Sequence, residues 1–278
     1  MTVIVFTLIV LFGSYFAGLL GSLTGLGGGV VIIPLLTLAL NVDIHYAIGA
    51  SLVSVIATSS GSAATFVKEG ITNMRLGMFL EIATTIGALT GAMLATHIPT
   101  HYIAILFGVI LIFSALISLK NKVAYTVKEK TYLGEKLRLD GVYPTADGPV
   151  TYGIDNISGG FFMMVFAGII SGLLGIGSGA LKVIAMDTIM RVPFKVSTTT
   201  SNFMIGVTAS ASAVVYLQRG YISPGLSMPV VIGVLFGAIT GSKILVNTTS
   251  SKWLRYTFAL VVSFLAIQMI NNGIKGVL

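Results

Sequence analysis

A lysine follows a run of glycines in the second half of the chain, in the segment Gly175-Ile176-Gly177-Ser178-Gly179-Ala180-Leu181-Lys182. Glycines permit a tight turn and let the backbone approach a ligand closely. The N–H groups of a segment that restarts after such a turn can bind an anion, and Lys182 would add a full positive charge. The predicted chemistry is anion binding by residues 177–179 and Lys182. The alternative is a lysine whose side chain only reaches back to a membrane surface.

A second glycine run, Gly25-Leu26-Gly27-Gly28-Gly29, lies in the first half of the chain. It has no lysine, because the position that corresponds to Lys182 is Ile32. We expect this run to offer the same anion only backbone donors, from Gly27, Gly28 and Gly29. The alternative is that its small residues let helices pack closely.

Hydroxyl and amide side chains follow the lysine, in the segment Ser197-Thr198-Thr199-Thr200-Ser201-Asn202. Neutral donors of this kind can bind the oxygen atoms of an anion. We expect Ser51, Ser201 and Asn202 to complete the anion site. The alternative is that the two serines, early in their predicted helices, cap unpaired backbone N–H groups. Thr208 is expected to pack between helices.

Two carboxylates are candidates for carrying a coupling ion. Glu81 could carry a proton, or its side chain could reach out to the cytoplasmic surface. Asp187 precedes Arg191 by four residues, which is also the spacing of an ion pair within a helix. The three histidines share no metal-ligand spacing with a carboxylate and cysteine is absent, so we predict no metal, cofactor or thiol chemistry. No nucleophile stands beside a base, so an enzyme is not expected.

The chain contains an internal sequence repeat, in which the second copy follows the first by 150 residues. The offset places Ser201 on Ser51 and Thr208 on Thr58, and it also matches the two glycine runs and the pair Gly87 and Gly237. Duplicated halves that are interrupted at the same place are typical of membrane transporters and indicate where the binding site lies.

Composition places the chain in a membrane. Of its 278 residues, 55% are hydrophobic and 9% are charged, whereas soluble domains carry about a quarter charged residues. The net charge of +7 therefore indicates orientation in a bilayer and not nucleic-acid binding. The first hydrophobic stretch has no basic leading region, so we interpret it as a retained helix and not a signal peptide.

The hydrophobic segments number five in each half: 3–24, 30–41, 46–67, 76–96, 101–119, 158–174, 180–190, 196–217, 226–246 and 253–272. The second segment of each half covers about half a bilayer. The first two segments of each half are either a re-entrant hairpin or two tilted full spans. The expected fold is an all-α integral membrane protein with glycine-broken helices. Since five is odd, the two repeats would have inverted topology.

The cations orient these segments. With the N-terminus outside, the outside loops hold Arg219 and Lys275, and the inside loops hold Lys68, Arg75, Lys120, Lys122, Lys128, Lys130, Lys136, Arg138, Arg191, Lys195, Lys243, Lys252 and Arg255. Cytoplasmic loops are rich in lysine and arginine. Both termini are therefore predicted outside the inner membrane, with the centre of the chain in the cytoplasm.

The centre of the chain, residues 120–157, is polar and separates a first repeat, 1–119, from a second repeat, 158–278. Alternating residues around proline and glycine turns favour a small β-hairpin there. The alternative is a plain linker.

The chain resembles the TauE/SafE family of sulfite exporters and toluene-sulfonate permeases. The resemblance rests on the paired glycine runs and on Val192-Pro193-Phe194-Lys195-Val196, Thr200-Ser201-Asn202-Phe203-Met204 and Tyr216…Gly220-Tyr221-Ile222. It implies a carrier of sulfite or an organosulfonate such as sulfoacetate, and it favours export. Two positions depart from the family: Ser178 replaces a frequent glycine, and Ala50 a frequent threonine.

The expected function is membrane transport of a small sulfur-containing anion by alternating access, with lipid and the substrate as partners and no nucleic acid. Two alternatives stay open: an anion channel, and an uptake carrier for another small carboxylate or oxyanion. A sensor that uses the central hairpin is a further alternative.

Overall fold

A computed structural model describes residues 3–24, 27–119, 132–145, 148–247 and 252–276. Among these residues the two membrane halves contain ten helical segments, five in each half, and they confirm the all-α membrane fold. The first half contains α1 (Val3–Thr24), α2 (Gly29–Pro34) continued by the π-helical turn η1 (Leu35–Ala39), α3 (Ile44–Lys68), α4 (Met74–Ala95) and α5 (Thr100–Leu119). The second half contains α7 (Ile157–Leu174), α8 (Gly179–Ile184) continued by η2 (Ala185–Ile189), α9 (Phe194–Gln218), α10 (Pro224–Asn247) and α11 (Lys252–Ile274).

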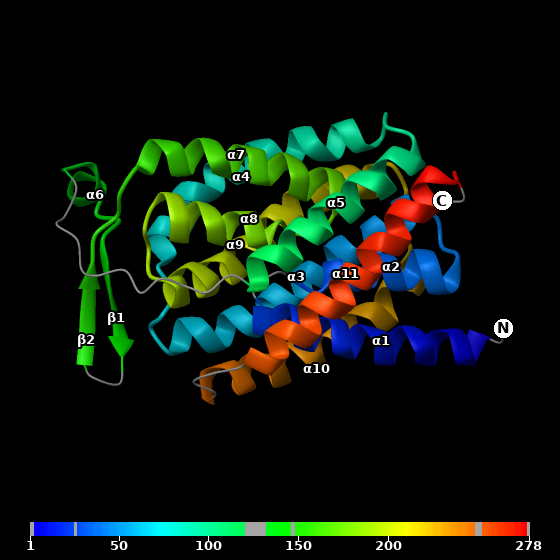
Figure 1. The fold of residues 1–278 in the computed structure, drawn as a ribbon, viewed down its shortest axis with the longest axis horizontal. Helices are drawn as coiled ribbons and strands as arrows, with labels where there is room; N and C mark the ends of the chain where they lie inside the picture. Colours follow the sequence, from blue (N-terminus) through cyan, green and yellow to red (C-terminus); the bar gives the residue numbers. More distant parts are fainter. Residues whose placement is uncertain (1–2, 25–26, 120–131, 146–147, 248–251, 277–278) are drawn as a thin grey trace.

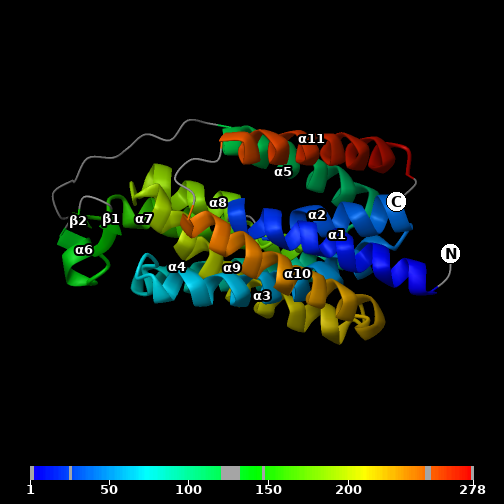
Figure 2. The same ribbon diagram turned by 90° about the horizontal axis from the view of Figure 1, so that it is seen from below.

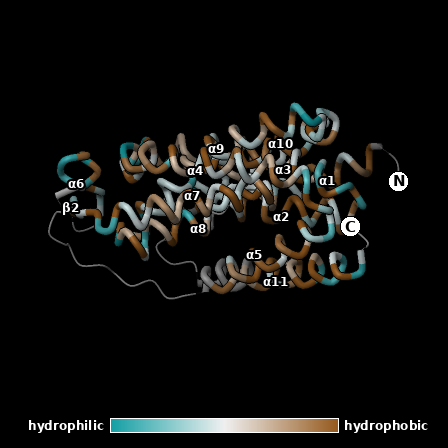
Figure 3. Tube along the Cα trace, turned by 90° about the horizontal axis from the view of Figure 1, so that it is seen from above, coloured by the Kyte–Doolittle hydropathy of each residue, from teal (hydrophilic) through white to brown (hydrophobic). Residues whose placement is uncertain are grey.

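Six of the described helices are long and apolar enough to cross a membrane, namely α1, α3, α4, α7, α9 and α10. Most residues along these helices are hydrophobic or intermediate in hydropathy, and hydrophilic residues gather at the turns and in the segment between the halves (Figure 3).

The helices interrupted by glycine are hairpins that return toward the end where they began. The backbone N–H of Asp155, just before α7, donates to the carbonyl oxygen of Met190, just after η2, at 3.0 Å. In the first half, Leu35 of η1 lies against Gly13 of α1. Each pair of segments therefore forms a hairpin, and the choice between a re-entrant hairpin and two full spans stays a prediction.

The helices of the two halves interlock. Helix α1 packs along α10, α4 along α7 and α3 along α9, while α5 and α11 pair as a layer beside the others (Figure 2). The closest approaches repeat at the offset of the sequence: Gly237 faces the carbonyl oxygen of Tyr15, and Gly87 faces that of Val165. Glycine at these positions lets the backbones touch. Inverted topology in a bilayer stays a prediction.

Both termini lie at one end of the molecule, and the segment between the halves lies at the other (Figure 1). That segment contains α6 (Tyr132–Lys136), β1 (Gly141–Thr145) and β2 (Gly148–Tyr152). The strands pair antiparallel, with Tyr143 opposite Val150, so the plain-linker alternative is wrong. The predicted cytoplasmic cations Lys120, Lys122, Lys128 and Lys130 lie outside the described residues.

The β-hairpin is fastened to the turn between α3 and α4. The Asn73 amide donates to the carbonyl oxygen of Leu139 at 2.8 Å and to the Tyr152 hydroxyl at 2.9 Å. Burial raises the pKa of Tyr152 to about 12, so its hydroxyl stays neutral at physiological pH. The Asn73 side chain also caps α4 by accepting from the N–H of Leu76. The centre of the chain is thereby tied to the start of α4.

Alanine at Gly87 or Gly237 should lower the free energy of unfolding by about 1–3 kcal/mol, because the new Cβ would collide with a backbone carbonyl of the partner helix. Thermal unfolding of the detergent-purified protein measures this. Gly225→Ala is the matched control, since Gly225 has open space around it and alanine favours helix. Equal loss of stability in all three variants would contradict the close packing.

Candidate functional site

The two glycine breaks meet halfway along the central helices. Gly27 and Gly177 have φ of 79° and 74°, a left-handed conformation that glycine adopts without strain. Both face the same two side chains, Val55 of α3 and Ile205 of α9. Each is the twelfth residue of a 25-residue helix. The sequence predicted that both breaks contribute to one site, and the structure brings them together at the middle of the molecule.

Two serines brace the breaks. The Ser51 hydroxyl of α3 donates to the carbonyl oxygen of Gly175 at 2.7 Å and lies directly beside Gly29. The Ser201 hydroxyl of α9 donates to the carbonyl oxygen of Gly179 at 3.2 Å. Each serine is the eighth residue of its helix, too far inside to cap it, so the capping alternative is wrong. Their hydroxyl protons stabilise the turns.

Lys182 lies in a charged cluster drawn from three helices. Its ammonium on α8 donates to the Thr208 hydroxyl on α9, and that hydroxyl donates to Oε1 of Glu81 on α4. The Lys182 Nζ lies 3.8 Å from Oε2 of Glu81. Lys182 is 0% and Glu81 6% exposed. A buried charge is stable only when it is paired and hydrogen-bonded, and this cluster meets both conditions.

The cluster corrects three sequence-based alternatives. Neither Lys182 nor Glu81 reaches a membrane surface, since both side chains are enclosed by protein. Thr208 does more than pack between helices, because it links the two charges. Sequence reasoning missed this role, although the one available signal was that Thr208 matches Thr58 at the repeat offset.

Several buried polar atoms near the breaks have no hydrogen-bond partner among the described residues. They include the Ser178 hydroxyl, Oδ1 of Asn202 and Oε2 of Glu81. The Asn202 amide nitrogen donates to Thr198 at 3.2 Å, which leaves its oxygen as the open group. Ser178 has φ of 45°, an uncommon conformation for a residue with a side chain and one that is often found at functional sites.

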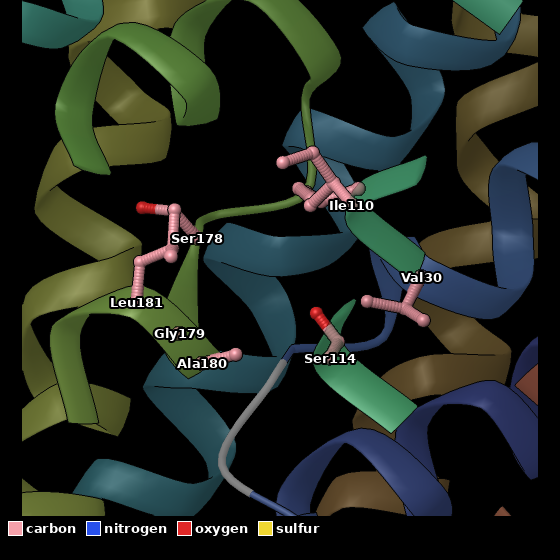
Figure 4. Close-up of a pocket in the computed structure, with 8 residues that line it drawn as sticks. Val30, Ile110, Ser114, Ser178, Gly179, Ala180 and Leu181 are labelled. Carbon is pink, nitrogen blue, oxygen red and sulfur yellow. The ribbon is translucent and has the colours of Figure 1, made fainter. Parts of the chain in front are cut away.

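A small pocket adjoins the second break (Figure 4). Its lining comes from the break and α8, from α2 and from α5: Val30, Ile110, Ser114, Ile176, Ser178, Gly179, Ala180 and Leu181. Ser178, whose hydroxyl has no hydrogen-bond partner among the described residues, is therefore one of the residues that line the pocket. The pocket volume is about 10 Å³, roughly the room that one water molecule requires. A multi-atom anion does not fit into this pocket.

The predicted helical ion pair between Asp187 and Arg191 is not formed. Segment η2 ends at Ile189, and Arg191 has a left-handed φ of 56°, so the helical spacing of four residues does not apply. Arg191 instead forms an ion pair with Asp155 at 3.3 Å. Among the described residues, no three histidine, aspartate or glutamate side chains are close enough together to hold a metal ion.

The sequence was compared with known proteins. It matches the family model described as sulfite exporter TauE/SafE over residues 10–269. It is 29% identical to the probable membrane transporter protein YunE of Bacillus subtilis, over 97% of this chain and 98% of that protein. It is 25% identical to the probable membrane transporter protein YdhB of the same organism, over 85% and 89% of the two chains. No solved structure matches it.

Lys182→Met should lower the free energy of unfolding at neutral pH by about 3–5 kcal/mol, because Glu81 would remain buried without its partner. Adding Glu81→Leu should restore most of that loss, since both charges are then gone. Thermal and denaturant unfolding of the purified variants measure this. Lys243→Met, at an exposed lysine, is the control and should change little. Additive losses in the double variant would contradict the ion pair.

Proposed function

The chain belongs to the sulfite exporter TauE/SafE family of membrane transporters, and we propose that it carries small sulfur-containing anions, sulfite or an organosulfonate such as sulfoacetate. The observation that carries this proposal is a fully buried lysine beside two glycine breaks that meet halfway along the central helices. A lysine at this depth is expected to serve an ion pathway or a binding site.

The proposed binding site lies between the breaks. Lys182 supplies the charge, and backbone N–H groups of residues 27–29 and 177–179 supply further donors. The Ser178 hydroxyl is available, since it has no partner among the described residues. Ser51, Ser201 and Asn202 surround the site, with the serines holding its backbone in place. The set suits an anion with several oxygen atoms because its donors approach from different elements.

Transport is proposed to follow alternating access. The pocket beside the second break has room for about one water molecule, so this part of the proposed site would have to widen to take the substrate. Rocking of one half against the other would open it. The contact of α1 with α10 and the contact of α4 with α7 involve residues that correspond at the repeat offset. This equivalence supports two halves related by a two-fold axis.

The proposed location is the cytoplasmic membrane, with both termini outside and the β-hairpin in the cytoplasm. Cations of the described residues support this orientation. Arg75 lies near the β-hairpin end, because it follows Asn73, which contacts Leu139 beside β1. Arg191 lies there too, because it pairs with Asp155, which closely follows β2. Lys275 lies near the C-terminus at the opposite end. Export is proposed because of the family, and an uptake carrier is the alternative.

Sulfite or sulfoacetate should raise the thermal stability of the purified protein, because a ligand that binds only the folded state stabilises it by mass action. Lys182→Met should weaken binding about 10- to 100-fold, since a hydrogen bond to a charged group contributes about 1.5–3 kcal/mol. Lys243→Met is the matched control and should bind as the wild type does.

The same proteins in liposomes separate the alternatives. Saturable flux of labelled sulfite supports a carrier, whereas flux that never saturates and a large unitary conductance would favour a channel. An equal thermal shift with acetate and phosphate would contradict the sulfur-anion class.

The orientation can be tested with single cysteines, because the chain contains none. Lys275→Cys should react with a membrane-impermeant maleimide in right-side-out vesicles. Thr151→Cys, exposed on β2, should react only after the vesicles are permeabilised. The reverse pattern would show that the proposed orientation is wrong.

A further inference from the structure

Glu81 and the proposed substrate anion would compete for the ammonium group of Lys182. In this conformation Glu81 lies 3.8 Å from the ammonium, so the positive charge proposed to bind substrate is already neutralised. A substrate anion added to this pair would place two negative charges and one positive charge in the middle of the membrane-embedded part. An uncompensated charge there is costly. The substrate therefore has to arrive together with something that removes the charge of Glu81.

We propose that Glu81 binds a proton when a monovalent substrate anion, such as hydrogen sulfite or a simple sulfonate, binds Lys182, so that one proton crosses the membrane with each such anion. This rests on the proposed function, in which Lys182 holds the anion. It adds the identity of the coupling ion and the residue that carries it.

The geometry around Glu81 suits a proton that comes and goes. Oxygen Oε1 accepts hydrogen bonds from Thr208 and, at 3.4 Å, from Thr85. Oxygen Oε2 has no hydrogen-bond partner among the described residues and faces Lys182 at 3.8 Å. A proton added at Oε2 converts the carboxylate into a neutral acid while Oε1 keeps both hydrogen bonds.

Thr208 can keep its hydrogen bonds to both Lys182 and Glu81 when the ion pair between them is lost. A hydroxyl can donate one hydrogen bond and accept two, so Thr208 can keep its bond to Oε1 while it still accepts from Lys182. The ammonium has three N–H donors. Two of them are then free for the oxygen atoms of an incoming anion.

The charged groups around the pair are few. Helix α7, which packs along α4, has no titratable residue over Ile157–Leu174. The titratable residues of helix α9 are Lys195 and Tyr216, near its two ends. Helix α9 contacts Glu81 through the Thr208 hydroxyl. Asp187 on η2 is half-buried and lies five residues beyond Lys182. Of the described charged groups, Lys182 is the one in contact with the Glu81 carboxylate.

The charge balance gives the coupling. With nothing bound, the positive Lys182 and the negative Glu81 sum to zero. With a monovalent anion and one proton bound, Lys182, the anion and neutral Glu81 again sum to zero. Only these two forms can change conformation without moving an unpaired charge through the membrane. The proton is taken up at Oε2 on one side and released from the same atom on the other, when the ion pair forms again.

Isothermal titration calorimetry with methanesulfonate and with sulfite tests the proposal. Methanesulfonate stays ionised at all working pH values, so protons taken up on binding belong to the protein. Titrations in two buffers of different ionisation enthalpy count those protons. The wild type should take up about one proton per methanesulfonate at neutral pH. Its affinity should fall about tenfold per pH unit as Glu81 ionises.

Two variants place the proton on Glu81. Glu81→Gln mimics the protonated acid, so its affinity should no longer depend on pH and its proton uptake should vanish. Glu69→Gln, at an exposed acid on the end of α3, is the control and should behave as the wild type does. Proton uptake that persists in Glu81→Gln would overturn the assignment to Glu81.

The wild-type titration needs no variant and separates this inference from the proposed function. Binding of methanesulfonate without proton uptake and without pH dependence would overturn the coupling but leave the anion carrier standing. No binding of either anion, from mildly acidic to mildly alkaline pH, would overturn both.

Discussion

One constraint underlies the structure: backbone can leave the helical conformation inside a membrane only where protein surrounds it and pairs its polar groups. The chain leaves the helix twice, at the two glycine breaks. Both breaks are enclosed by α3 and α9, and the Ser51 and Ser201 hydroxyls satisfy carbonyl groups there. The interlocked packing of the two halves follows from this need, because each break has to be shielded from lipid by helices of both halves.

A second consequence is that the enclosed centre can hold charge. Lys182 lies one helical turn after the second break, so the same fold that shields the backbone also buries the ammonium group. Burial alone would neutralise the lysine or expel it. Glu81 and Thr208 stabilise its charge, and they come from helices that pack around the hairpin of α7 and α8. The breaks and the ion pair are therefore parts of one arrangement.

The sequence was sufficient to predict the helices and the glycine breaks, but not the contacts between distant side chains. Hydrophobic segments and glycine runs located every membrane helix and both breaks, because these depend on local composition. The contact of Lys182 with Glu81 could not be predicted, since the two lie about a hundred residues apart. Lys182 was predicted to bind an anion, and Glu81 was predicted either to carry a proton or to reach the cytoplasmic surface. The spacing of Asp187 and Arg191 was misleading because it assumed a continuous helix, and η2 ends between them.

The two halves share their packing but not their chemistry. At the repeat offset, Lys182 corresponds to Ile32 and Glu81 corresponds to Val231, whereas Thr208 corresponds to Thr58. The duplicated scaffold therefore holds one charged site and one apolar counterpart. Glu81 comes from the first half, and Lys182 and Thr208 come from the second. Any movement of one half against the other changes this contact directly. An ion pair placed across that boundary can link the protonation of one half to anion binding by the other, which a pair within a single half could not do.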